Sequence, residues 1–464
     1  MFRLHQLAGL LVAPLVAVLV LTGMGYALAP SIGRVLYHQE LTATSDLPAR
    51  PVSEQVEAAV QQHPDLKVAA VRISDDPSDT TRVSFLDPTL GERQKRSVYL
   101  DPGSLEIKGE QVTTGGSGHL PVYAWLLDGH RRLWLGDPGR IYAEVATSWL
   151  MFLALGGIYL WWDRRRRKRG ARAAKQERPR RESARGRQMR KHTNLGLWGT
   201  AGVLFLGITG LTMTLVAGEN IDALRKTEGW VAPKVSTKLP KELAAKAEQA
   251  AESGKGKGGQ GSSTAPYAQA DTVYSTAREY GLTRKVDLTW PKEAGKAWTA
   301  AESRQEFRLH RDQLAVDGRT GTITHTVPFS SYPLVAKLVD WGIDIHMGTL
   351  FGLPNQLVLV AVAIALLFIV YCGYRMWFLR NKRVIPSSGW REMHPGVLVW
   401  GCWGSSPTQL SLRSSGRAWW RCCFSTPSSG QSTKPAAASA RARGASVSGA
   451  DEIARQGTGL APKP

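Results

Sequence analysis

The chain has 464 residues, 43% of them hydrophobic, and a formal net charge of +21, which is long enough for two or three domains. The charge is concentrated, because the stretch 163–191 holds fifteen Lys or Arg residues and three Asp or Glu, so that +12 of the +21 lies in one loop. No aromatic or base-reading pattern accompanies this charge, which argues against nucleic-acid binding.

Four apolar segments are long enough to cross a bilayer, whose hydrocarbon core of about 30 Å requires about 20 helical residues. Lys and Arg flank each segment on the side that, by the positive-inside rule, faces the cytosol. We therefore expect a multi-pass protein of the bacterial inner membrane, with a cytoplasmic N-terminus and two extracytoplasmic regions. The first apolar run is about twice as long as a signal-peptide core, so we interpret it as an uncleaved anchor. The segments lie at roughly 7–29, 141–162, 195–217 and 355–379.

The two outer regions show α+β patterns. In the first, PVSEQVEAAVQQHP has a helical pattern, and KVAAVRIS, TRVSFLD and RSVYLD alternate as strands do. In the second, a helix near 268–280 is followed by the strand-like TRKVDLTW, KAWTAAES and QLAVD. The linker before this helix contains a formal GxGxxG from Gly256 to Gly261, which we reject as a dinucleotide site because no strand precedes it.

These patterns divide the chain into eight segments. They are, in order, the first span at 1–30, a module at 31–125, an interfacial segment with the second span at 126–163, a basic cytoplasmic loop at 164–191, the third span at 192–217, a linker with a second module at 218–332, an interfacial segment with the fourth span at 333–380, and a cytoplasmic tail at 381–464. The tail is rich in Ser, Arg, Gly, Trp and Cys without periodicity, so we interpret it as disordered or as the product of a reading-frame shift.

The unit of helix, outer module and helix occurs twice. An offset of 216 residues pairs His130 with His346 and Pro138 with Pro354, and this register holds for over sixty residues. An offset of 187 residues aligns the first span with the third. Both copies run in the same direction, so we expect two parallel repeats related by an axis near the membrane normal. Each proline should interrupt its helix and leave the histidine on a short interfacial segment.

Four histidines lie at matched positions beside the spans. The repeat places His5 opposite His192 near the cytoplasmic side, and His130 opposite His346 near the outer side. Imidazole is a common iron ligand, and two imidazoles on facing helices hold a flat macrocycle from both sides. We therefore predict two haem sites whose iron has these four side chains as axial ligands.

A macrocycle between helices also requires small residues beside it. Gly9 and Gly196 lie one turn beyond the histidines of the first and third spans. Gly23 and Gly210 follow the same two histidines by eighteen residues, about five turns or ~27 Å, so they share that helix face and reach the depth of the outer pair. We predict that these four glycines pack against the haems.

Each feature alone has a simpler explanation. A single histidine at a membrane interface is usually a polar anchor, and a Thr-Gly pair in a span usually serves helix packing. Trp161, Trp162 and Trp377 are typical of an aromatic belt. Two symmetric pairs of histidines, each with a matched glycine, favour paired ligation over these explanations.

The motifs RLHQLAGLL, DGHRRLWLGDPGRI, RKHTNLGLWG and IDIHMGTLFGLPNQLVLV, which fall within residues 1–383, resemble the PepSY-associated transmembrane family, also called iron-regulated membrane proteins. The resemblance implies PepSY-like α+β domains outside the membrane and a bundle of membrane helices. It also implies that the chain is similar to members that reduce ferric siderophores with b-type haems.

The resemblance and the two ligand pairs together suggest electron transfer through two b haems to an external ferric siderophore or other ferric complex, in iron acquisition. The cytosolic loops show no flavin or nicotinamide site, so the electron donor would be a quinol or a separate protein. No catalytic side chain is identified. One alternative is a non-redox PepSY membrane protein that binds peptides or regulates a protease, which predicts colourless membranes. A transporter built on parallel repeats is a third reading, but it requires ionisable residues within the spans, which almost lack them.

Overall fold

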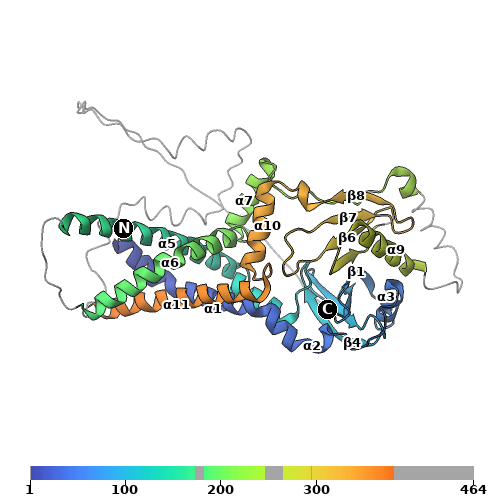
Figure 1. The fold of residues 1–464 in the computed structure, drawn as a ribbon, viewed down its shortest axis with the longest axis horizontal. Coiled ribbons are helices and arrows are strands. Elements are labelled where there is room, and N and C mark those ends of the chain that lie inside the picture. Colours follow the sequence, from blue (N-terminus) through green and yellow to red (C-terminus); the bar gives the residue numbers. More distant parts are fainter. Residues whose placement is uncertain (1, 173–181, 246–264, 294, 381–464) are drawn as a thin grey trace, which may run out of the picture. The chain divides into compact units, whose positions relative to one another are not determined.

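The computed structural model describes residues 2–172, 182–245, 265–293 and 295–380 (Figure 1). The tail at 381–464 and the glycines at 256–261 therefore lie outside the described residues. Within them, four helices are long and apolar enough to cross a membrane. They are α1 (Phe2–Leu36), α5 (Gly136–Arg172), α6 (Ala184–Leu211) and α11 (Gly352–Phe378).

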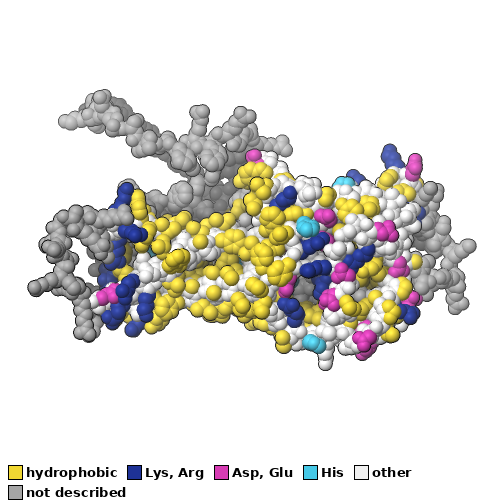
Figure 2. All heavy atoms as spheres, viewed as in Figure 1, with side chains coloured by type: hydrophobic (Ala, Val, Ile, Leu, Met, Phe, Trp, Pro, Cys, Tyr) yellow, Lys and Arg dark blue, Asp and Glu magenta, His cyan; other side chains and the backbone are white. Residues whose placement is uncertain are grey.

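The four long helices form one bundle (Figure 1). Helix α1 packs against α5 and α11, and α6 packs against the same two helices. Small and branched side chains fill the bundle interior, including Val16, Ala146 and Val203. Hydrophobic side chains also cover the outside of the bundle, and Lys and Arg gather at the end away from the strands (Figure 2). A helix that is apolar all round is typical of a membrane span.

A short helix precedes α5 and another precedes α11. Helix α4 (Pro121–Arg132) ends four residues before α5 begins, and Leu133 and Trp134 between them have left-handed backbone angles, with φ of 52° and 56°. Helix α10 (Leu334–His346) ends before α11, which begins at Gly352. The helical runs are therefore interrupted, as the prolines at 138 and 354 predicted, and each proline lies in the first turn of the long helix, where its missing N–H has no intrahelical partner.

The strands of both outer regions form one antiparallel sheet of eight strands in the order β4-β3-β2-β1-β5-β6-β7-β8. The sequence predicted two separate modules, but β1 pairs with β5 and joins them. This pairing gives each module a partner for a strand edge that would otherwise be open. The strands are β1 (Lys67–Ile73), β2 (Thr81–Leu86), β3 (Gln94–Leu100), β4 (Ile107–Thr114), β5 (Val286–Thr289), β6 (Trp298–Glu302), β7 (Gln313–Val316) and β8 (Ile323–Val327).

One face of this sheet carries the soluble core. Helices α3 (Val52–Val60) and α9 (Ala265–Tyr280) pack against each other and against strands of both halves. Val71, Val83 and Val98 from adjacent strands are fully or almost fully buried beneath them. The opposite face is left for polar side chains. Shorter helical segments connect these parts, namely α2 (His38–Leu41), α7 (Val216–Thr227) and the single turn η1 (Phe329–Ser331).

Candidate haem-binding sites

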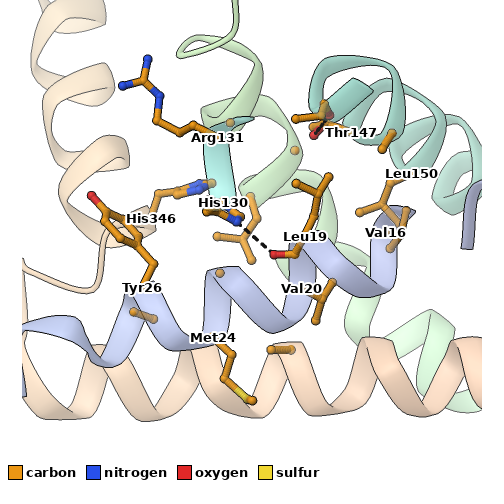
Figure 3. Close-up of a pocket in the computed structure, with 18 of the residues that line it drawn as sticks. Val16, Leu19, Val20, Met24, Tyr26, His130, Arg131, Thr147, Leu150 and His346 are labelled. Atoms are coloured by element: carbon orange, nitrogen blue, oxygen red, sulfur yellow. Dashed lines mark hydrogen bonds between the residues drawn. The ribbon is translucent and has the colours of Figure 1, made fainter. Parts of the chain in front are cut away.

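The outer histidines lie at the ends of the two short helices. His130 occupies the last turn of α4 and His346 is the last residue of α10. Their ring centroids are 6.3 Å apart, and the ring planes make an angle of 48°. The two side chains point toward one another at one end of the helix bundle (Figure 3). The interruption before each long helix therefore places both imidazoles in a single cavity.

The inner histidines lie near the starts of α1 and α6. The ring centroids of His5 and His192 are 6.4 Å apart, and the ring planes are nearly perpendicular, at 88°. The structure thus brings together both pairs that the sequence predicted, at nearly equal spacings. That these residues are haem ligands stays a prediction.

Three of the four imidazoles are oriented through Nδ1. His130 Nδ1 lies 2.9 Å from the carbonyl oxygen of Leu19, and His192 Nδ1 lies 3.0 Å from that of Ile369. A carbonyl oxygen only accepts, so each Nδ1 carries the proton, and Nε2 is the nitrogen with a free lone pair. Fixing one ring nitrogen in this way is how proteins orient a metal-binding imidazole.

His346 reaches the same tautomer through a hydroxyl group. Its Nδ1 lies 2.7 Å from Thr209 Oγ1, and that hydroxyl donates to the carbonyl oxygen of Phe205 at 2.8 Å. Because the hydroxyl proton is used there, the oxygen accepts from Nδ1–H. His5 differs, since its Nδ1 is buried and has no hydrogen-bond partner among the described residues.

Each histidine ring lies against a glycine. A Cβ atom added to Gly23 would lie 2.8 Å from His130 Cε1, and one added to Gly210 would lie 3.5 Å from His346 Cε1. In the inner site, a Cβ at Gly157 would lie 3.6 Å from His5 Cε1, and one at Gly373 would lie 4.0 Å from His192 Cε1. The glycines therefore leave room for the imidazoles themselves.

The predicted glycines divide into two groups. Gly23 and Gly210 contact the outer pair at the depth that the five-turn spacing predicted. A Cβ atom at Gly9 or Gly196 would meet nothing within 4 Å, so the structure brings neither of them against another side chain. Gly157 and Gly373, which the 216-residue offset pairs with each other, were not among the predicted glycines.

A cavity of about 190 Å³ surrounds the outer pair. Side chains from α1, α5, α6 and α11 line it, and most of them are apolar, as Leu19, Val16 and Leu150 are (Figure 3). The ring of Tyr26 lies nearly parallel to that of His130, with centroids 6.2 Å apart. The walls of the cavity are thus suited to a flat, apolar group.

Both outer imidazoles are held neutral. Burial lowers the pKa of His346 to about 3, with a further contribution from the charge that His130 would carry. Burial also lowers the pKa of His130, against the effect of its bond to the Leu19 carbonyl oxygen. The neutral form is the one whose Nε2 binds a metal.

The spacing of each pair would allow both imidazoles to bind one iron. A metal–imidazole bond of about 2 Å, with about 1.2 Å more from the nitrogen to the ring centre, separates two such centres by roughly 6 Å. Among the described residues, no group of three or more His, Cys, Asp and Glu side chains is arranged to hold a bare metal ion. The residues present fit haem, which takes two ligands from the protein.

The sequence model of the family described as "PepSY-associated TM region" matches residues 2–380. No protein with a curated description matches the sequence significantly. The family match spans all four long helices and the eight-stranded sheet, and it confirms the resemblance that the motifs indicated. We conclude that this multi-pass membrane protein, with an α+β domain attached to its helices, belongs to the PepSY-associated transmembrane family.

Proposed function

We propose that the chain is a b-type dihaem protein that carries electrons across the membrane and reduces an external ferric complex, as in ferric-siderophore reduction during iron acquisition. His5 and His192 would hold the inner haem, and His130 and His346 the outer one. The haems, when bound, supply the one-electron chemistry. A quinol or a separate protein is oxidised on the cytoplasmic side, and one electron converts each Fe³⁺ to Fe²⁺ outside.

One observation carries this proposal. Two pairs of histidines, far apart in the chain and near opposite ends of the spans, have ring centroids 6.3 and 6.4 Å apart. A polar anchor at an interface has no need of a second imidazole at this distance. In three of these rings Nδ1 also bonds to an oxygen atom on a neighbouring helix. This contact orients the ring and leaves Nε2 as the nitrogen available to a metal.

The protein residues have separate tasks in this proposal. The Leu19 and Ile369 carbonyl oxygens and the Thr209 hydroxyl keep the imidazoles in one tautomer and rotamer. The side chains that line the cavity around the outer pair are mostly apolar, which favours the neutral imidazole and raises the influence of any nearby charge on a reduction potential. Gly23 and Gly210 give the rings space beside the helices.

The topology that we propose is a duplicated unit in the bacterial inner membrane, with the N-terminus in the cytoplasm and the sheet outside. The Lys and Arg side chains at the bundle end away from the sheet support this orientation (Figure 2). The two parallel repeats explain why matched positions supply both members of each pair: His130 and His346, and His5 and His192.

The direct test is a reduced-minus-oxidised visible spectrum of membranes that contain the full chain. We expect b-type haem bands, of which His130→Ala and His5→Ala each remove about half. The matched control is His310→Ala, because His310 is an exposed histidine of the outer domain and should leave the bands unchanged. Colourless membranes with intact protein would refute the proposal and favour the non-redox alternative, in which the outer domain binds peptides or regulates a protease.

A further inference from the structure

A second cavity, of about 240 Å³, lies between the outer end of α1 and the polar face of the sheet. Met347, the residue after the outer ligand of α10, lines both this cavity and the one around the outer histidine pair. Four arginines and His119 line the second cavity, and none of its described lining residues is Asp or Glu. The arginines are Arg34, Arg72, Arg82 and Arg304. The second cavity is therefore cationic.

Strand register explains part of this charge. Arg72 on β1 is paired with Arg82 on β2, and Arg82 is paired with Tyr99 on β3. Residues directly opposite each other in an antiparallel sheet project from the same face. The valines next to them in the sequence point the other way, into the core. A row of three polar side chains therefore crosses the sheet on its cavity side.

Most of the lining arginines are neutralised by carboxylates. Arg72 makes two bonds to Asp287, of 2.7 and 2.8 Å, and Asp287 lies opposite it on β5. Arg304 pairs with Asp340 and Asp344, and Arg34 pairs with Glu306. Arg82 differs from these three, because it has no ion pair within the described part of the chain. It donates instead to two carbonyl oxygens, that of Gly118 at 2.9 Å and that of Ser117 at 3.5 Å.

Two buried polar side chains at this place contact each other. Tyr99 is 2% exposed, and its hydroxyl oxygen lies beside the Arg82 guanidinium as a hydrogen-bond acceptor. Because a guanidinium only donates, the hydroxyl proton of Tyr99 has no acceptor among the described residues. Buried polar groups in native proteins are nearly always satisfied, so this proton indicates a ligand that accepts a hydrogen bond.

The local field also favours an anion. Burial lowers the pKa of His119 to about 4, and the positive charges of three lining arginines add to this effect. Burial raises the pKa of Tyr99 despite the adjacent Arg82 guanidinium, so its hydroxyl keeps its proton at neutral pH and remains a donor.

Aromatic contacts connect this cavity to the outer histidine pair. The ring centroids of His119 and Tyr123 are 4.3 Å apart, and those of Tyr123 and Tyr26 are 4.8 Å apart. Tyr26 in turn stacks on His130. A ligand in the cationic cavity would therefore lie close to the outer site.

We propose that this cavity binds a carboxylate-bearing anion, with Arg82 and Tyr99 as its main contacts. On the basis of the proposed function, the external ferric complex would then be an anionic carboxylate chelate. A carboxylate fits because it can accept from the Tyr99 hydroxyl, and because its negative charge would complement Arg82, which has no ion pair among the described residues. A propionate of the outer haem has the same chemistry and is the other source of such a group.

The test is calorimetric titration of the purified full chain with citrate and with ferric citrate, and with an uncharged ferric trihydroxamate for comparison. We expect saturable binding of the two carboxylate probes only. Arg82→Gln should weaken this binding at least tenfold, and Tyr99→Phe, which removes one atom and is the safer variant for folding, several-fold. Arg50→Ala is the matched control, since Arg50 pairs with Glu54 on α3, away from the cavity lining.

The visible spectrum of the same samples separates the two sources. If the external chelate is the ligand, citrate binds the unaltered chain and Arg82→Gln keeps its haem content and potential. If a propionate occupies the cavity, citrate binds only after His130→Ala, and Arg82→Gln shifts the haem potential. Citrate binding that depends on Arg82 in a preparation without haem would refute the proposed function and support this inference. No citrate binding in any form, with an unaltered haem spectrum in Arg82→Gln and Tyr99→Phe, would overturn it.

Discussion

Replacing Gly23 with Ala should disable the outer site while leaving the helix intact. The added Cβ would lie 2.8 Å from His130 Cε1 and 3.1 Å from Nδ1, so an ordinary contact of 3.4 Å requires the ring to move by about 0.6 Å. Metal–ligand distances tolerate only about 0.2 Å. The movement also strains the 2.9 Å bond to the Leu19 carbonyl oxygen, which is worth about 1 kcal/mol.

The repeat supplies a matched control for this substitution. At Gly210 an added Cβ would lie 3.5 Å from His346 Cε1, which is an ordinary contact, so Gly210→Ala should be tolerated. Both changes replace glycine with alanine inside a helix, which by itself favours the helix by about 1 kcal/mol. The two variants therefore differ in the contact with the imidazole.

The assay is haem content per chain and the visible spectrum of the purified protein. We expect Gly23→Ala to lose most of the outer haem, about half of the total, or to convert it to a form with a weakened axial ligand. Gly210→Ala should retain both haems. Full haem content in Gly23→Ala, or an equal loss in Gly210→Ala, would refute the reasoning.

Three further predictions concern the outer histidine pair and the outer domain. Thr209→Val removes the one acceptor that His346 Nδ1 has among the described residues, and it should weaken outer haem binding about 10–100-fold. Thr22→Val should have little effect, because His130 keeps its bond to the Leu19 carbonyl oxygen; haem titration of the apoprotein compares the two variants. Asp101→Ala should destabilise the outer domain by about 3 kcal/mol or more in thermal unfolding, since it is fully buried and its carboxylate accepts from Thr44, Ser45, Gly103 and Ser104. Burial raises the pKa of Asp101, but these hydrogen bonds outweigh burial and leave the pKa well below its usual value. The carboxylate's contribution to stability is therefore present above about pH 4 and is lost as the pH falls further. Unchanged stability of the outer domain down to pH 2 would contradict this prediction.

The repeat in the sequence predicted more of the candidate sites than any single motif. It paired His5 with His192 and His130 with His346, and these rings are the ones that lie about 6 Å apart in the structure. Helical periodicity predicted that Gly23 would reach the depth of the outer pair, because a straight helix converts sequence separation into distance. The spans were predictable for the same reason, since length and apolarity are local properties.

What the sequence did not predict depends on contacts between distant elements. The alternating pattern of β1 and β5 indicated that both are strands. It did not indicate that these two strands pair with each other and join the two halves in one sheet. The cationic cavity has the same origin. Arg72, Arg82 and Tyr99 form a row only after the register of three strands is known. Gly373 became a neighbour of His192 through helix packing that periodicity within one helix does not describe.

The measurement that tests the central proposal most directly is the number of haems per intact chain, determined by pyridine haemochrome assay on purified protein of verified mass. Two facing imidazole pairs predict two b-type haems per chain, one for each pair, and none in a double variant His5→Ala/His130→Ala. Intact protein without iron and porphyrin, or with haem that both substitutions leave in place, would contradict the proposal.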